Sequence, residues 1–185
     1  MRVELLSVWV CAAVIPALGA VAADRDGSLE GAAPAANHPS LSSARTEVFA
    51  PWIHPLMPAP VRDKIEAAFA IAIGRVTAVP ECAELFSQLG ADGMETLKTG
   101  LYFPASAPKE TSICRRSMAQ TYVGGAPTWI CRRVSSYSDE HVALVVIHEA
   151  LHHAGLTEKP QDRNAMSSGD INTMVRRECR FKKWR

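Results

Sequence analysis

The chain has 185 residues, of which 48% are hydrophobic and 21% are charged, and its formal net charge at pH 7 is +1. This composition is that of an ordinary globular protein and excludes disordered and collagen-like chains. The length suits one domain of about 100–200 residues, and the near-zero net charge gives no reason to expect nucleic acid as a partner.

The first 22 residues have the pattern of a cleaved export signal. Arg2 supplies a basic start, Leu5 to Val21 is an apolar run, and Ala20-Val21-Ala22 fits a small-x-small cleavage site. The alternative is a membrane anchor, but the run is interrupted by Pro16 and lacks a flanking stop-transfer cluster. We therefore expect residues 1–22 to be a signal peptide and the mature protein to be secreted or periplasmic, with no membrane span.

Removal of this segment takes away one of the five cysteines and leaves an even set: Cys82, Cys114, Cys131 and Cys179. An even number of cysteines in an exported chain predicts two disulfides, for which three pairings exist. Cys114 and Cys131 flank a short span rich in strand and turn residues, which favours a local bridge and leaves Cys82 to pair with Cys179. The alternative, a four-cysteine zinc site, requires closely spaced CxxC pairs, which the sequence lacks.

Residues 23–60 have a different composition from the rest of the chain. They hold six of the twelve prolines, much alanine and serine, and little periodicity. This pattern predicts an extended arm or a pro-segment rather than part of a core. The folded domain is then expected over residues 61–185.

Within that domain the apolar spacing predicts mostly helices. Apolar residues advance in threes and fours from Val61 to Val76, which is typical of a helix, and Pro80 marks its end. Residues 119–136 are rich in β-branched and aromatic residues around a Gly-Gly-Ala-Pro turn, which predicts a hairpin. Further helices are expected over residues 81–89, 141–154 and 169–181. The predicted class is α+β, mostly helical with a short antiparallel hairpin or sheet.

The motif that carries chemistry lies on the predicted helix 141–154. It reads His148-Glu149-Ala150-Leu151-His152, an HExxH sequence, in a stretch that holds four of the six histidines. Positions four apart lie on one face of a helix, so His148 and His152 can point at one ion. Glu149 projects beside the metal and can accept a proton from activated water. The spacing predicts one catalytic zinc ion with Glu149 as general base.

Two histidines leave such a site one protein ligand short, because catalytic zinc normally has three. Gly155 can adopt a left-handed conformation that ends the helix and turns the chain back, and Glu158 follows three residues later. We favour Glu158 as the third ligand. Asp162, Asp170 and Glu178 remain as alternatives.

The eleven residues from His148 to Glu158 read HExxHxxGxxE and resemble the HExxHxxGxxH/D motif of the metzincin peptidases, within the zincin superfamily. The resemblance implies His148 and His152 as zinc ligands and Glu149 as the catalytic base. The chain departs from the metzincin pattern in having glutamate at position 158, and no clear Met-turn follows. The wider passage, with Glu-x-Pro and a helix ending in cysteine, resembles small secreted bacterial zincin-like proteins of unassigned role.

We therefore expect a zincin-like domain over residues 61–185 that hydrolyses peptide or related amide bonds in a peptide or protein substrate. The alternative is a non-catalytic, disulfide-stapled binding or envelope protein that retains a zincin scaffold, because about 125 residues leave little room for a substrate-binding subdomain. The last ten residues, 176–185, include six basic side chains. They predict a solvated surface, with an acidic partner as the alternative.

Overall fold

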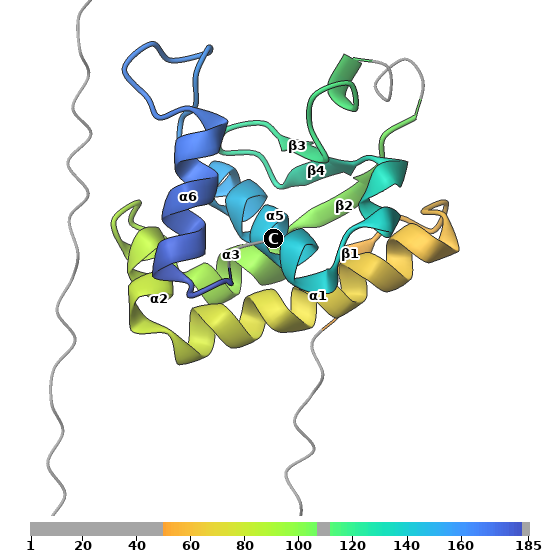
Figure 1. Cartoon of the computed structure of the whole chain (residues 1–185), viewed down its shortest axis with the longest axis horizontal. Helices are drawn as coiled ribbons and strands as arrows, with labels where there is room; N and C mark the ends of the chain where they lie inside the picture. The colour runs from red at the N-terminus through yellow and green to blue at the C-terminus, as the bar shows by residue number, and fades with distance from the viewer. Residues whose placement is uncertain (1–49, 107–111, 183–185) are drawn as a thin grey trace, which may run out of the picture. The chain divides into compact units, whose positions relative to one another are not determined.

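The computed structural model describes residues 50–106 and 112–182 (Figure 1). The expected signal peptide and residues 23–49 of the expected arm lie outside this part. The strands are β1 (Trp52–Ile53), β2 (Leu101–Pro104), β3 (Ala119–Thr121) and β4 (Pro127–Ile130). The helices are α1 (Ala59–Ala78), α2 (Pro80–Ser87), α3 (Gly93–Thr99), α5 (Asp139–His153) and α6 (Ser168–Glu178), with a 3-10 turn at Arg132–Ser136. The expected α+β class is confirmed, and so are the five predicted elements.

The sheet has the strand order β1-β2-β4-β3. Strands β1, β2 and β4 are parallel, and β3 pairs antiparallel with β4 at one edge. Tyr102, Thr121 and Thr128 share one register position across the sheet and are all buried. Side chains alternate between the two faces of a strand, so these residues mark the face that is covered by helices.

Helix α5 lies at the centre of the fold, where it contacts α1, α3, α6 and β3 (Figure 1). The Ser138 side chain caps its start by accepting a hydrogen bond from the backbone N–H of His141. Every residue from Val146 to His152 is buried. The polar side chains in this buried stretch are held away from bulk water, so each of them costs free energy unless it has a hydrogen-bond partner or a bound ion.

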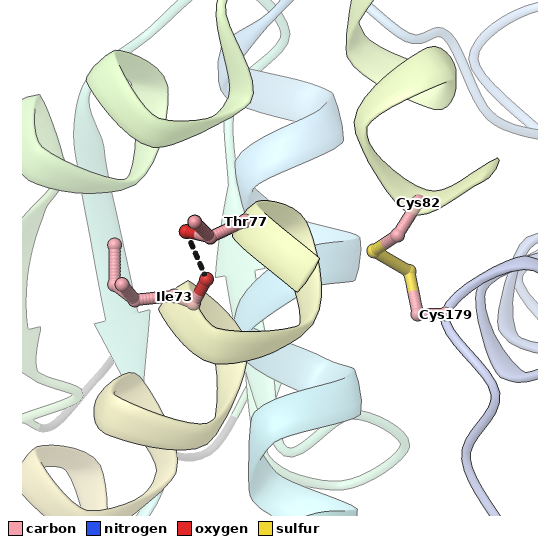
Figure 2. The surroundings of a disulfide bond; sticks show 4 residues. All are labelled: Ile73, Thr77, Cys82 and Cys179. Atoms are coloured by element: carbon pink, nitrogen blue, oxygen red, sulfur yellow. Dashed lines mark hydrogen bonds between the residues drawn. A yellow bond between two sulfur atoms is a disulfide. The ribbon is translucent and has the colours of Figure 1, made fainter. Parts of the chain in front are cut away.

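Two disulfides fasten the domain, in the pairing that the sequence favours. Cys82 of α2 is bonded to Cys179 at the end of α6, with 4.5 Å between the two Cα atoms. Figure 2 shows this bond and, in its surroundings, the last turn of α1, where the Thr77 hydroxyl donates to the Ile73 carbonyl (2.8 Å). The second bond joins Cys114 to Cys131. Two disulfides fit an oxidising compartment, such as the periplasm or the extracellular space.

The structure contains three elements that the sequence pattern did not predict, namely β1, β2 and α3. Strand β2 adds two parallel pairings to the expected antiparallel hairpin. Trp52 and Ile53, within the expected arm, form β1 because their backbone pairs with β2. Helix α3 forms at Gly93–Thr99, in a segment for which the sequence pattern predicted no element. The Asp92 side chain caps it by accepting from the Glu95 backbone N–H (2.7 Å). A Cβ at Gly93 would lie 2.7 Å from the Phe86 ring, so this glycine permits close packing and does not break the helix.

Within residues 50–106 and 112–182, none of the helices combines the length and the apolar character that a bilayer crossing requires.

Candidate metal centre

His148 and His152 stand one helical turn apart on α5, and their side chains meet. The two Nε2 atoms are 3.0 Å apart, and the ring centroids are 4.8 Å apart. His148 is 5% exposed and His152 is 6% exposed. The spacing of four residues therefore brings both imidazoles to one buried point, as the helical period requires.

The chain after α5 turns back and adds a carboxylate at this point. Gly155 has φ +105°, which few residues other than glycine adopt, and the Leu156 N–H donates to the Leu151 carbonyl to close the helix end. The returning backbone is held by a bridge between Glu158 and Met166. As a result, Glu158 Oε2 lies 2.9 Å from His152 Nε2 and 3.2 Å from His148 Nε2.

These three atoms have the arrangement of a metal-ligand set. Atoms separated by 2.9–3.2 Å lie on a circle of about 1.8 Å radius. A single ion at the usual zinc–ligand distance of about 2.0–2.2 Å would therefore be within bonding reach of all three atoms. Among the described residues, His148, His152 and Glu158 form the one group of three or more metal-binding side chains.

Hydrogen bonds behind the rings fix which nitrogen faces the centre. His152 Nδ1 is 2.7 Å from the Leu156 carbonyl oxygen, which can only accept, so Nδ1 carries the proton. His148 Nδ1 is 2.9 Å from Asn172 Oδ1, also an acceptor, so in this ring too the proton is on Nδ1. The neutral rings thus direct two Nε2 lone pairs at each other and at the Glu158 carboxylate. When both rings are neutral in this way, these three electron-rich atoms repel one another, and the repulsion is relieved either by a proton on a ring Nε2 shared with Glu158 or by a metal cation between the three atoms.

The pKa shifts of His148 and Glu158 indicate a centre that favours positive charge. Burial lowers the pKa of the His148 imidazole, but hydrogen bonding to Glu158 and the nearby Glu149 charge are among the effects that outweigh it and raise the pKa. Hydrogen bonding to His148 holds the pKa of Glu158 below its ordinary value, despite partial burial. The third group at the centre is therefore an ionised carboxylate at neutral pH.

Glu149 lies beside this group and is buried, with 6% of its surface exposed. Burial raises the pKa of its carboxyl above the ordinary value, although the charges of His148 and His152 lower it. Hydrogen bonding by Thr121 of β3 also lowers it, but less than burial raises it. Its Oε2 atom is buried without a hydrogen-bond partner. Buried carboxylate oxygens rarely lack a hydrogen-bond partner. Glu149 Oε2 can therefore accept a proton or a hydrogen bond from a water molecule.

The three alternative third ligands are engaged elsewhere. The Asp162 carboxylate accepts from the Thr157 hydroxyl (3.1 Å) and from a backbone N–H. Asp170 belongs to the capping box at the start of α6, and Glu178 pairs with Arg177. The geometry favours Glu158 among the four acidic candidates.

Three neighbours of the centre had no signal in the sequence. Asn172 and Thr121 lie 24 and 28 residues from the residues that they contact, His148 and Glu149, and no motif spacing links them. The third neighbour is the turn after β3, where the Gly124 N–H donates to the His152 carbonyl (2.9 Å). Only the packing of β3 and α6 against α5 brings these groups to the site.

Comparison with known protein families, with curated proteins and with solved structures found no match to the chain.

Proposed function

We propose that the chain is an exported, zinc-dependent hydrolase of the zincin type, which cleaves peptide or related amide bonds. The observation that carries this proposal is the convergence of His148 Nε2, His152 Nε2 and Glu158 Oε2, with the Nδ1 atom of each imidazole facing an acceptor oxygen outside the centre. Two histidines and a carboxylate are a donor set that catalytic zinc uses, with a fourth position left for water or substrate.

His148, His152 and Glu158 would hold the ion. A zinc ion bound there supplies a Lewis acid that polarises the scissile carbonyl and makes water more acidic. The buried Glu149 provides the proton acceptor. Its Oε2 takes a proton from water as the water oxygen attacks the carbonyl carbon, and the same proton passes to the leaving nitrogen as the C–N bond breaks.

The raised pKa of Glu149 supports this assignment. A general base works best when its pKa lies close to the operating pH, and burial moves this carboxyl in that direction. A free carboxylate on the surface is a weaker base and serves less well. The missing partner of Oε2 leaves this atom free for the reaction.

The position of β3 supports a peptide as substrate. This strand is at the edge of the sheet, paired with β4 on one side, and its Thr121 bonds to Glu149. An extended peptide can add to the edge of a sheet through backbone hydrogen bonds. A substrate bound in this way would run close to the catalytic carboxylate.

The proposal is tested by separating zinc binding from hydrolysis. Glu149→Gln should keep one zinc per chain and lose hydrolysis by about 10²–10⁴-fold, which is the usual contribution of a general base. His148→Ala should lose both zinc and hydrolysis. His153→Ala is the matched control, because this histidine lies on the same helix outside the metal-ligand group and should keep both. Undiminished hydrolysis by Glu149→Gln would refute the assigned mechanism.

The second candidate is a non-catalytic secreted binding protein that retains a zincin scaffold. The buried state of the centre favours it, because a substrate needs access to the ion. The cavity of about 540 Å³ between α2 and α6 is lined by none of the three candidate ligands, so it is not a substrate pocket next to the ion. Stoichiometric zinc without cleavage of any member of a broad peptide library would favour this candidate over the hydrolase.

A further inference from the structure

Helix α6 places one polar side chain directly behind a candidate zinc ligand. Asn172 Oδ1 lies 2.9 Å from His148 Nδ1, across 24 residues of sequence. The other imidazole has a different support, since His152 Nδ1 faces the backbone carbonyl of Leu156 at 2.7 Å. The orientation of one ring is thus set by the backbone, and that of the other by a side chain that can be changed.

Asn172 is held in place from both ends of its helix. At the start of α6, Ser167 and Asp170 form a reciprocal capping box. At its end, Cys179 is bonded to Cys82 of α2. Between these points Ile171 and Val175 are fully buried against the core. This support restricts where the Asn172 amide can lie, so its contact with His148 is a fixed feature of the fold.

The contact decides which nitrogen of His148 can bind a metal. An imidazole that donates from Nδ1 has its lone pair on Nε2, and Nε2 is the atom that faces His152 and Glu158. Without an acceptor behind Nδ1, the neutral ring can place its proton on Nε2 instead. That tautomer turns an N–H bond toward the centre and blocks coordination. The acceptor also increases the basicity of the ligand nitrogen.

We propose that Asn172 is a positioning residue that fixes the tautomer and orientation of His148 and thereby sets the metal affinity of the site. The role of Asn172 in metal binding rests on the proposed zinc site, whereas its effect on the His148 ring does not. It touches neither the ion nor the substrate, so its effect on catalysis is indirect.

The test uses the full secreted protein with both disulfides formed, and compares three variants. Asn172→Ala removes the acceptor, and Asn172→Asp keeps an oxygen at the same place. Thr173→Ala is the matched control, because it removes a side-chain hydrogen bond of the same helix, to Gly169, that does not involve the site. Zinc dissociation constants are measured by competition with a chromophoric chelator. The tautomer of His148 is measured in metal-free protein by long-range ¹⁵N–¹H NMR, at a pH high enough that the ring is neutral in every variant.

We expect Asn172→Ala to weaken zinc binding by about 10–100-fold, as loss of a hydrogen bond behind a ligand usually does, and to increase the Nε2–H tautomer of His148. Asn172→Asp should restore the wild-type tautomer and an affinity within about threefold of wild type, whereas Thr173→Ala should change neither. If Asn172→Ala leaves the affinity and the tautomer unchanged, the proposal is overturned. Failure of Asn172→Asp to restore them also overturns it, because an amide that donates from Nδ2 has no equivalent in aspartate.

Failure of the zinc site itself gives a different result. In that case wild-type protein binds no zinc, while the NMR measurement on metal-free protein still reports the His148 tautomer in each variant. An unchanged tautomer in Asn172→Ala then overturns the positioning role, and a shifted one upholds the effect of Asn172 on the ring.

Discussion

The two disulfides should contribute unequally to stability, because they close loops of very different length. The Cys82–Cys179 bond spans 97 residues and the Cys114–Cys131 bond spans 17. Treated as restrictions on the unfolded chain, loops of these lengths correspond to about 4.7 and about 3.1 kcal/mol at 25 °C. The short loop lies inside the long one, which shortens the long loop to roughly 80 residues and lowers its value to about 4.5 kcal/mol.

The measurement is urea unfolding of metal-free protein in which one bond is removed at a time. The pair Cys82→Ala with Cys179→Ala should lower the free energy of unfolding by about 4.5 kcal/mol. The pair Cys114→Ala with Cys131→Ala should lower it by about 3 kcal/mol. Paired alanines leave no unpaired thiol behind. An equal or larger loss from the short-loop pair would refute the reasoning from loop length.

Three further predictions concern the turn, the cap and the third ligand. Gly155→Ala should destabilise the protein by about 1–2 kcal/mol, because the φ of Gly155 is +105°. Gly74→Ala should stabilise it by about 0.5–1 kcal/mol, because Gly74 lies inside α1 with no atom within 4 Å of the new Cβ. Urea unfolding measures both, and changes of the same sign would contradict the reasoning from backbone conformation. Hydrogen bonds from Ser167 lower the pKa of Asp170 below its ordinary value. The stabilising effect of Asp170 is therefore present at neutral pH and is lost as the pH falls through that lowered pKa. Asp170→Asn should lower the urea midpoint at pH 7 and lower it by less at pH 2, and a loss of equal size at both pH values would contradict the prediction. Glu158→Gln should weaken zinc binding by at least 100-fold, because it removes the anionic ligand while keeping the shape of the side chain. Competition with a chelator measures the zinc affinity, and an unchanged affinity would show that another residue is the third ligand.

The helical part of the fold could be predicted because each long helix has a local signature. The apolar period from Val61 to Val76 and the Ser138 start of α5 are readable within one segment of sequence. The sheet could be predicted only in part. The β3–β4 hairpin is a local feature, but β2 pairs in parallel with β1 and β4, which come from segments far away in the chain. Such pairings depend on tertiary packing, which no short sequence pattern encodes.

The residues of the candidate site, too, could be predicted only in part. The positions of His148, Glu149 and His152 follow from the helical period alone. Glu158 could be favoured over other acids because Gly155 signals a reversal, yet its contact with both imidazoles depends on the loop that ends at Met166. Asn172 could not be predicted, since its role follows from how α6 packs on α5.

The central claim is that the chain binds one metal ion between the two histidines of α5 and Glu158. The most direct measurement is the zinc content of purified protein with both disulfides formed, after dialysis against metal-free buffer. We predict one zinc per chain for the wild type and none for His152→Ala, with X-ray absorption showing only nitrogen and oxygen neighbours at about 2.0–2.2 Å. A wild-type protein that is folded and retains no zinc, or retains it equally well without His152, would contradict the account.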